Sequence, residues 1–125
     1  MLGKQNIVAV DDSAIMLRRL KTILSEKYDF FAFTKGDRAY SFIEHMPPDL
    51  IILDIEMPEI NGYDLLEMIK ENKALQNIPI IFLTSNSERA SVIKAVEGGA
   101  NDYMKKPIDE DTLLNKIQKL LSNKK

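Results

Sequence analysis

Near the middle of the chain stands LIILDIEMPEING, residues 50–62. Its first four residues are apolar without interruption, which is typical of a short strand buried on both faces of a parallel sheet. Asp54 follows this run directly, and Pro58 and Gly62 then mark a loop before the next helical segment. We expect Gly62 to allow a left-handed turn in that loop. The segment predicts a central strand that carries an acidic residue at its carboxyl end.

Further apolar runs lie on both sides of this strand, at residues 7–10, 30–33, 80–83 and, more weakly, 102–104. Segments in which apolar residues recur with helical spacing follow the runs, around residues 17–24, 39–46, 65–69, 90–96 and 113–121. Strand and helix thus alternate five times, and this order predicts right-handed crossovers and a parallel sheet. We predict an α/β fold with a five-stranded parallel sheet in the order 2-1-3-4-5, doubly wound (flavodoxin-like) by five helices.

The composition bounds the class of protein. A chain of 125 residues fits one domain, 1–125, whose polar tail at 122–125 we expect to fray. The absence of cysteine excludes thiol catalysis, disulfides and cysteine-based zinc sites, and a single histidine argues against a histidine-rich metal site. A net charge of -2 argues against direct nucleic acid binding, and no apolar run approaches the length of a membrane span. We expect a soluble, cytoplasmic domain.

Acidic residues follow two strands that the predicted order makes neighbours. Asp11 and Asp12 end the first strand, and Asp54 ends the third. In a doubly wound sheet, ligands bind beyond the carboxyl ends of the strands where the strand order reverses, and here that point lies between these two strands. Three carboxylates at one place repel one another, and Mg²⁺ would relieve the repulsion. The alternative is that Asp12 is the N-cap of a helix that begins near Ser13.

The fourth and fifth strands end in residues that suit an anionic ligand. Thr84 and Ser85 place hydroxyl groups beside the acidic pocket, and Lys106 offers a positive charge. Together, these residues resemble the receiver domains of two-component response regulators. The resemblance covers the whole chain and is carried by Asp11-Asp12, Asp54-x-x-Met57-Pro58-x-x-x-Gly62, Thr84-Ser85 and Tyr103-x-x-Lys106-Pro107.

The resemblance implies roles for the residues of the pocket. Asp54 corresponds to the phosphoacceptor, which takes a phosphoryl group from a sensor histidine kinase or phosphotransfer protein. Asp12 and Asp54 would ligate Mg²⁺ directly, Asp11 would act mostly through water, and Glu56 would contribute its backbone carbonyl. The variable position of Glu56, two residues after the acceptor, is expected to influence the lifetime of the phosphoryl group.

The resemblance also implies a switch. Thr84 would donate its hydroxyl to a phosphoryl oxygen, and Lys106 would pair with the phosphoryl group or with Asp54, with a cis bond to Pro107. Tyr103 would change rotamer and alter the face made by the fourth helix, fifth strand and fifth helix. That face would then bind a partner, an output domain or a second copy of the chain. Ile108 stands where many DNA-binding relatives have phenylalanine, which argues against that transcriptional subgroup.

The predicted function is a signalling domain that catalyses only its own phosphorylation and dephosphorylation. Two other classes of protein share part of this pattern. A haloacid-dehalogenase-like phosphatase also uses an aspartate nucleophile with Mg²⁺, but that family needs Asp-x-Asp after its first strand, where this chain has adjacent Asp11 and Asp12. A nucleotide- or flavin-binding module would be expected to carry Gly-x-Gly or Gly-x-x-x-x-Gly-Lys, and neither motif occurs.

Overall fold

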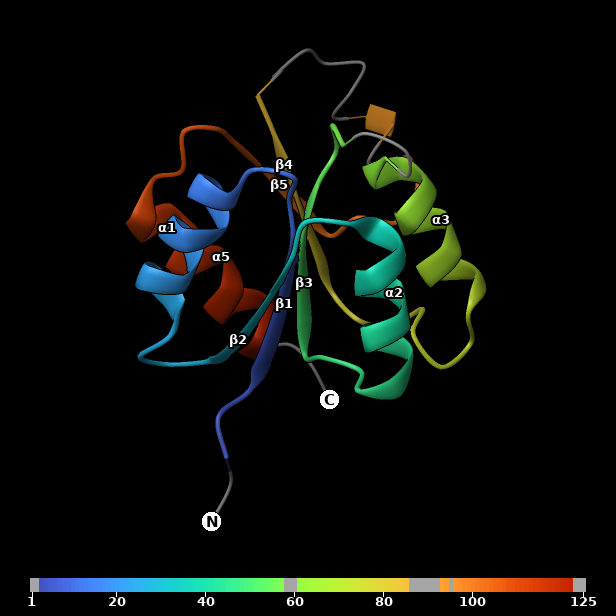
Figure 1. Ribbon diagram of the computed structural model, residues 1–125, viewed down its shortest axis with the longest axis horizontal. Coiled ribbons are helices and arrows are strands. Elements are labelled where there is room, and N and C mark those ends of the chain that lie inside the picture. The colour runs from blue at the N-terminus through green and yellow to red at the C-terminus, as the bar shows by residue number, and fades with distance from the viewer. Residues whose placement is uncertain (1–2, 58–60, 86–92, 95, 123–125) are drawn as a thin grey trace.

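A computed structural model describes residues 3–57, 61–85, 93–94 and 96–122 of the chain. Its centre is one parallel sheet of five strands (Figure 1). The strands are β1 (Asn6–Val10), β2 (Asp29–Phe33), β3 (Leu50–Asp54), β4 (Ile80–Thr84) and β5 (Asp102–Lys105). They lie in the order β2-β1-β3-β4-β5, which confirms the predicted topology.

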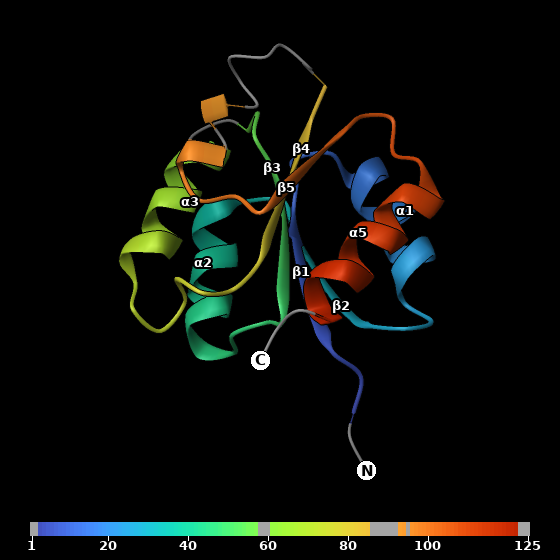
Figure 2. The same cartoon turned by 180° about the vertical axis from the view of Figure 1, so that it is seen from behind.

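Helices cover both faces of the sheet. They are α1 (Ala14–Leu24), α2 (Gly36–His45), α3 (Gly62–Glu71) and α5 (Glu110–Ser122). Figures 1 and 2 show α1 and α5 on one face and α2 and α3 on the other. The described residues thus hold four complete helices, where the sequence predicted five. Most of the remaining predicted helix lies outside the described residues, although positions 93–94 and 96–97 are helical.

Two apolar clusters, one on each face, explain why the central strand reads as a continuous apolar run. Ile51 and Leu53 pack in the cluster beneath α2 and α3, whereas Leu50 and Ile52 pack in the cluster beneath α1 and α5. Successive side chains of a strand point to opposite faces, so a sheet covered on both faces needs apolar residues at every position. β3 is accordingly buried along its whole length.

The edge strand β2 departs from the expectation of burial on both faces. Its residues Phe30, Phe31 and Phe33 are only half-buried, and Ala32 is exposed. β2 pairs with β1 alone, because it stands at the end of the strand order.

Within the described residues, no helix combines the length and the apolar character that crossing a membrane requires.

Candidate functional site

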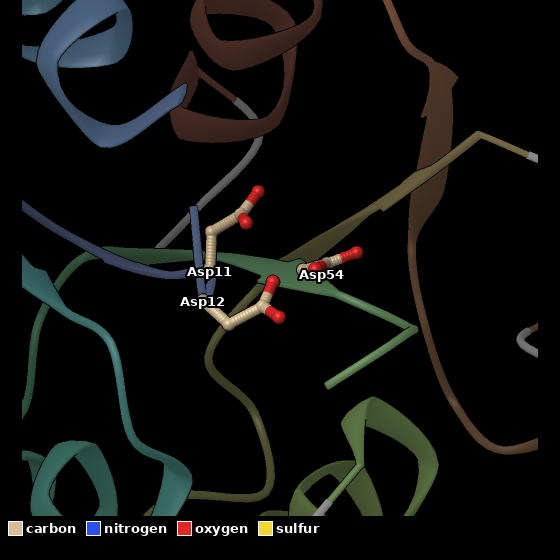
Figure 3. Close-up of side chains that lie close together, drawn as sticks. All are labelled: Asp11, Asp12 and Asp54. Carbon is tan, nitrogen blue, oxygen red and sulfur yellow. The ribbon is translucent and has the colours of Figure 1, made fainter. Parts of the chain in front are cut away.

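The three predicted acidic residues meet at the carboxyl ends of β1 and β3. These strands pair in parallel with Val10 opposite Leu53, so the residues that follow them emerge side by side. One carboxylate oxygen from each of Asp11, Asp12 and Asp54 lies within 4.8 Å of the others. Figure 3 shows the three side chains close together. Asp11 and Asp54 are buried, whereas Asp12 is exposed. The topology therefore brings the predicted cluster together.

The N-cap of α1 is Ser13, so the alternative role for Asp12 is wrong. The Ser13 hydroxyl accepts a hydrogen bond from the amide of Met16 at 3.2 Å. Asp11 supports the same turn, because its Oδ1 accepts from the amide of Ser13 at 2.9 Å. Asp12 is thus left exposed at the mouth of the acidic pocket, where it can contribute to binding a ligand.

Lys106 bridges the two buried carboxylates. Its Nζ lies 3.0 Å from Oδ2 of Asp11 and 3.4 Å from Oδ1 of Asp54. The backbone amide of Lys106 donates to the carbonyl of Thr84 at 2.8 Å, which ties the end of β5 to the end of β4. The bond between Lys106 and Pro107 is cis, as expected. The lysine predicted to face the phosphoryl group therefore lies beside Asp54, the predicted acceptor.

The pocket shifts the proton equilibria of its groups. Burial, followed by the negative charge of Asp11, raises the pKa of Asp54 from 3.8 to about 7, although Lys106 and a hydrogen bond from the Glu56 amide at 3.2 Å oppose the shift. Burial alone would lower the pKa of Lys106, but its contacts with the two aspartates outweigh burial and raise that pKa. One lysine therefore compensates the buried negative charge only in part.

This donor set fits Mg²⁺. A hard divalent cation takes oxygen ligands, and the pocket offers three carboxylates within reach of one another. Burial, and then the charge of Asp11, disfavour the charged form of Asp54, and a second cation would oppose both effects. The Glu56 backbone carbonyl stays a prediction, although its amide already bonds to Asp54.

A contact across the pocket mouth was not foreseen. The hydroxyl of Ser85, just after β4, donates to Oε1 of Glu56 at 2.8 Å. It holds the Glu56 side chain against the neighbouring strand end. Both residues follow strand ends in the sequence, but no local pattern shows that they would pair.

Gly62 is needed for a different reason than the sequence suggested. The expected left-handed turn is wrong: Gly62 begins α3, and the described glycine with positive φ is Gly99. A Cβ at Gly62 would lie 2.6 Å from the Cα of Ile55 and would strike the backbone carbonyl of Asp54. The amide of Gly62 donates to the Ile55 carbonyl at 2.9 Å. The close approach of α3 to the loop after β3 therefore excludes a side chain.

The two predicted switch residues lie on neighbouring strands. Thr84 is buried at the end of β4, and Tyr103 is 38% exposed in β5. Tyr103 stands opposite Phe82, two residues before Thr84, so both side chains belong to the face of the sheet that α3 covers. Residues 86–92, which include the start of the predicted fourth helix, lie outside the described residues.

Comparison with known proteins adds the family. Residues 7–118 match the family model of the response regulator receiver domain. The chain is 35% identical, over 99% of its length, to a probable cyclic di-GMP phosphodiesterase of Vibrio cholerae, of which it covers 28%. A sensory transduction protein, BceR of Halalkalibacterium halodurans, is 31% identical over 92% of the chain, which covers 49% of that protein. The chain thus spans about half or less of the length of these relatives.

Solved structures agree with the family match. The receiver domain of a signal transduction histidine kinase from Syntrophus aciditrophicus is 37% identical, with a TM-score of 0.89 and coverage of 97% of this chain and 92% of that one. A putative response regulator from Chloroflexus aurantiacus gives a TM-score of 0.92 at 27% identity, with coverage of 97% and 100%. Matching sequence, strand order and acidic pocket place the chain among the response regulator receiver domains of two-component signalling.

Proposed function

We propose that Asp54 accepts a phosphoryl group from a histidine of a sensor kinase or phosphotransfer protein, and that this reaction needs Mg²⁺. One observation carries the proposal: a buried carboxylate at the end of β3 meets two further carboxylates and the amine of Lys106. Asp54 is 1% exposed, and its oxygen Oδ1 already contacts the lysine and the Glu56 amide. Such a carboxylate is oriented for attack rather than free to rotate.

In the transfer, a carboxylate oxygen of Asp54 forms a bond to phosphorus as the phosphorus–nitrogen bond of phosphohistidine breaks. The electron pair of that bond leaves with the imidazole. Asp11, Asp12, Asp54 and the Glu56 carbonyl would hold Mg²⁺, which when bound stabilises negative charge on the transferring oxygens. The deprotonated form of Asp54 is the nucleophile, so the positive charge of Lys106, 3.4 Å away, favours the reactive state.

Lys106 and Thr84 would also stabilise the phosphorylated form of Asp54. The phosphoryl group adds negative charge beside Asp11, and Lys106 can pair with that charge from its present position. Thr84 ends β4, the strand beside β3, and its hydroxyl would donate to a phosphoryl oxygen. Fixed donors of this kind supply most of what phosphoryl transfer requires.

Phosphorylation would change the surface near Tyr103. A groove of about 340 Å³ between β5 and α5 is lined by Tyr103, Lys105, Pro107, Thr112 and Lys116 among others. Movement of Thr84 toward the phosphoryl group would free space for the Tyr103 ring and change this surface. The surface would then bind a second copy of the chain, an output domain or another protein. The phosphoryl group of the kinase would come from ATP, so we expect the transfer to take place in the cytoplasm.

The test is phosphorylation by acetyl phosphate with Mg²⁺, followed by intact mass measurement. The protein should gain one phosphoryl group, which hydroxylamine should remove because an acyl phosphate is reactive toward that nucleophile. Asp54→Asn should abolish the gain. The matched control is Asp64→Asn, which makes the same change at an exposed position in the first turn of α3 and should be labelled normally. Undiminished labelling of Asp54→Asn would refute the assignment.

A further inference from the structure

Arg19 connects α1 to the loop that carries Lys106. Its Nη2 donates to the backbone carbonyl of Ile108 at 2.9 Å, across 89 positions of sequence. Ile108 is buried and packs in the cluster formed by α1 and α5, which Figure 2 shows side by side. The guanidinium therefore holds the backbone of this loop at a position two residues after Lys106.

The same loop is anchored on both sides of that contact. Before it, the amide of Lys106 donates to the Thr84 carbonyl. After it, Oδ2 of Asp109 accepts from the amide of Thr112 at 3.0 Å and from its hydroxyl at 2.6 Å, at the start of α5. These two hydrogen bonds, and more weakly the charge of Arg19, lower the pKa of Asp109. The path of the loop is thus fixed at three points, and only Arg19 among these anchors comes from α1.

The lysine depends on that path. Its Nζ must stay near two carboxylates at once, at 3.0 and 3.4 Å, while the side chain remains 21% exposed. A long, flexible side chain keeps such a geometry only if its backbone is held, because otherwise several rotamers compete. We propose that Arg19 is a positioning residue for the phosphorylation of Asp54. By holding the Ile108 carbonyl, Arg19 keeps Lys106 at the phosphoryl site. The inference rests on the proposed function. Arg19 itself touches neither the phosphoryl donor nor the phosphoryl acceptor.

The experiment is a double-mutant cycle between Arg19→Met and Lys106→Met, with acetyl phosphate and Mg²⁺ as the probe. Arg19→Met keeps most of the side-chain length and removes the donor. It should slow the phosphorylation of Asp54 by about tenfold, since a misplacement of about 1 Å can cost roughly 100-fold. In the Lys106→Met background, Arg19→Met should not lower the phosphorylation rate further, because the amine that Arg19 positions is already removed.

The matched control is Arg18→Met. Arg18 precedes Arg19 on α1 and is exposed, and both arginines line a groove between α1 and Glu110 at the start of α5. Replacing Arg18 therefore removes the same charge from the same surface. It should leave the rate within about twofold of the unmutated protein. NMR supplies a readout that general destabilisation would not imitate: Arg19→Met should shift the Lys106 amide and Nζ signals, and Arg18→Met should not. Arg19→Lys, which keeps a charged donor, should recover part of the rate.

Two results would overturn the inference. The first is a rate of Asp54 phosphorylation in Arg19→Met equal to that in Arg18→Met. The second is a loss of rate from Arg19→Met that is as large in the Lys106→Met background as in the unmutated protein. If Arg19→Met melts below the assay temperature, Arg19→Gln takes its place, and unmoved Lys106 signals in that variant would equally overturn the inference. Labelling that persists in Asp54→Asn would instead refute the proposed function.

Discussion

Replacing Asp54 by asparagine is expected to stabilise the protein above pH 7, although it removes the proposed phosphoacceptor. The pKa of Asp54 rises from 3.8 to about 7 on folding, so the folded protein disfavours the charged form. Each pKa unit corresponds to about 1.4 kcal/mol, which gives about 4 kcal/mol for the full shift. Because water reaches the pocket at the exposed Asp12, we reduce the expected gain to about 2 kcal/mol.

The sign follows from proton binding. Between pH 4 and about pH 7, the folded state holds a proton on Asp54 that the unfolded chain has released, so the contribution of Asp54 to the stability falls as the pH rises. Asparagine cannot lose a proton, and its oxygen can still accept from the Glu56 amide. The advantage of Asp54→Asn should therefore be largest at pH 8 and smaller at pH 5.

Thermal unfolding, followed by circular dichroism in buffer with EDTA, measures the difference. A gain of about 2 kcal/mol in a chain of this length corresponds to an increase of about 8 °C in Tm at pH 8. The control is Asp12→Asn, which neutralises the exposed carboxylate and should change the stability by about 0.5 kcal/mol or less. An Asp54→Asn variant that melts no higher than the unmutated protein at pH 8, or whose advantage does not shrink at pH 5, would contradict the reasoning.

Three further predictions concern the same pocket. Mg²⁺ at about 100 times its Kd should raise the stability by about 2.7 kcal/mol, and Asp54→Asn should lose this gain; a melting curve unmoved by Mg²⁺ would argue against the metal site. Lys106→Met should lower the free energy of unfolding in urea by about 2 kcal/mol at pH 8, because the buried Asp11 loses its ion pair. Unchanged stability would mean that the pair contributes nothing. Gly62→Ala should cost about 1–3 kcal/mol through its clash with the loop after β3, whereas Gly3→Ala, which has open space around it, should be neutral in the same urea titration.

The strand order and the meeting of the acidic residues could be predicted from the sequence, for a physical reason. Burial on both faces leaves a continuous apolar run in each central strand, and the helices between the strands force parallel pairing. Carboxyl ends of parallel strands lie at one edge of the sheet, so the positions of Asp11, Asp12 and Asp54 in the chain already implied a common site. Local pattern was sufficient here because periodicity and strand ends are local properties.

The state of each group in that site depended on the tertiary structure. Asp11 and Asp12 are adjacent in the sequence, yet one is buried against Lys106 and the other is exposed. Gly62 packs against the backbone of Asp54 and Ile55 across the loop after β3, and Arg19 bonds to the carbonyl of Ile108, 89 positions along the chain. Such contacts depend on the path of the whole chain, and desolvation and pKa shifts follow from them. Residue types and their spacing carry the chemistry of the pocket, whereas packing sets which group is charged, paired or held in place.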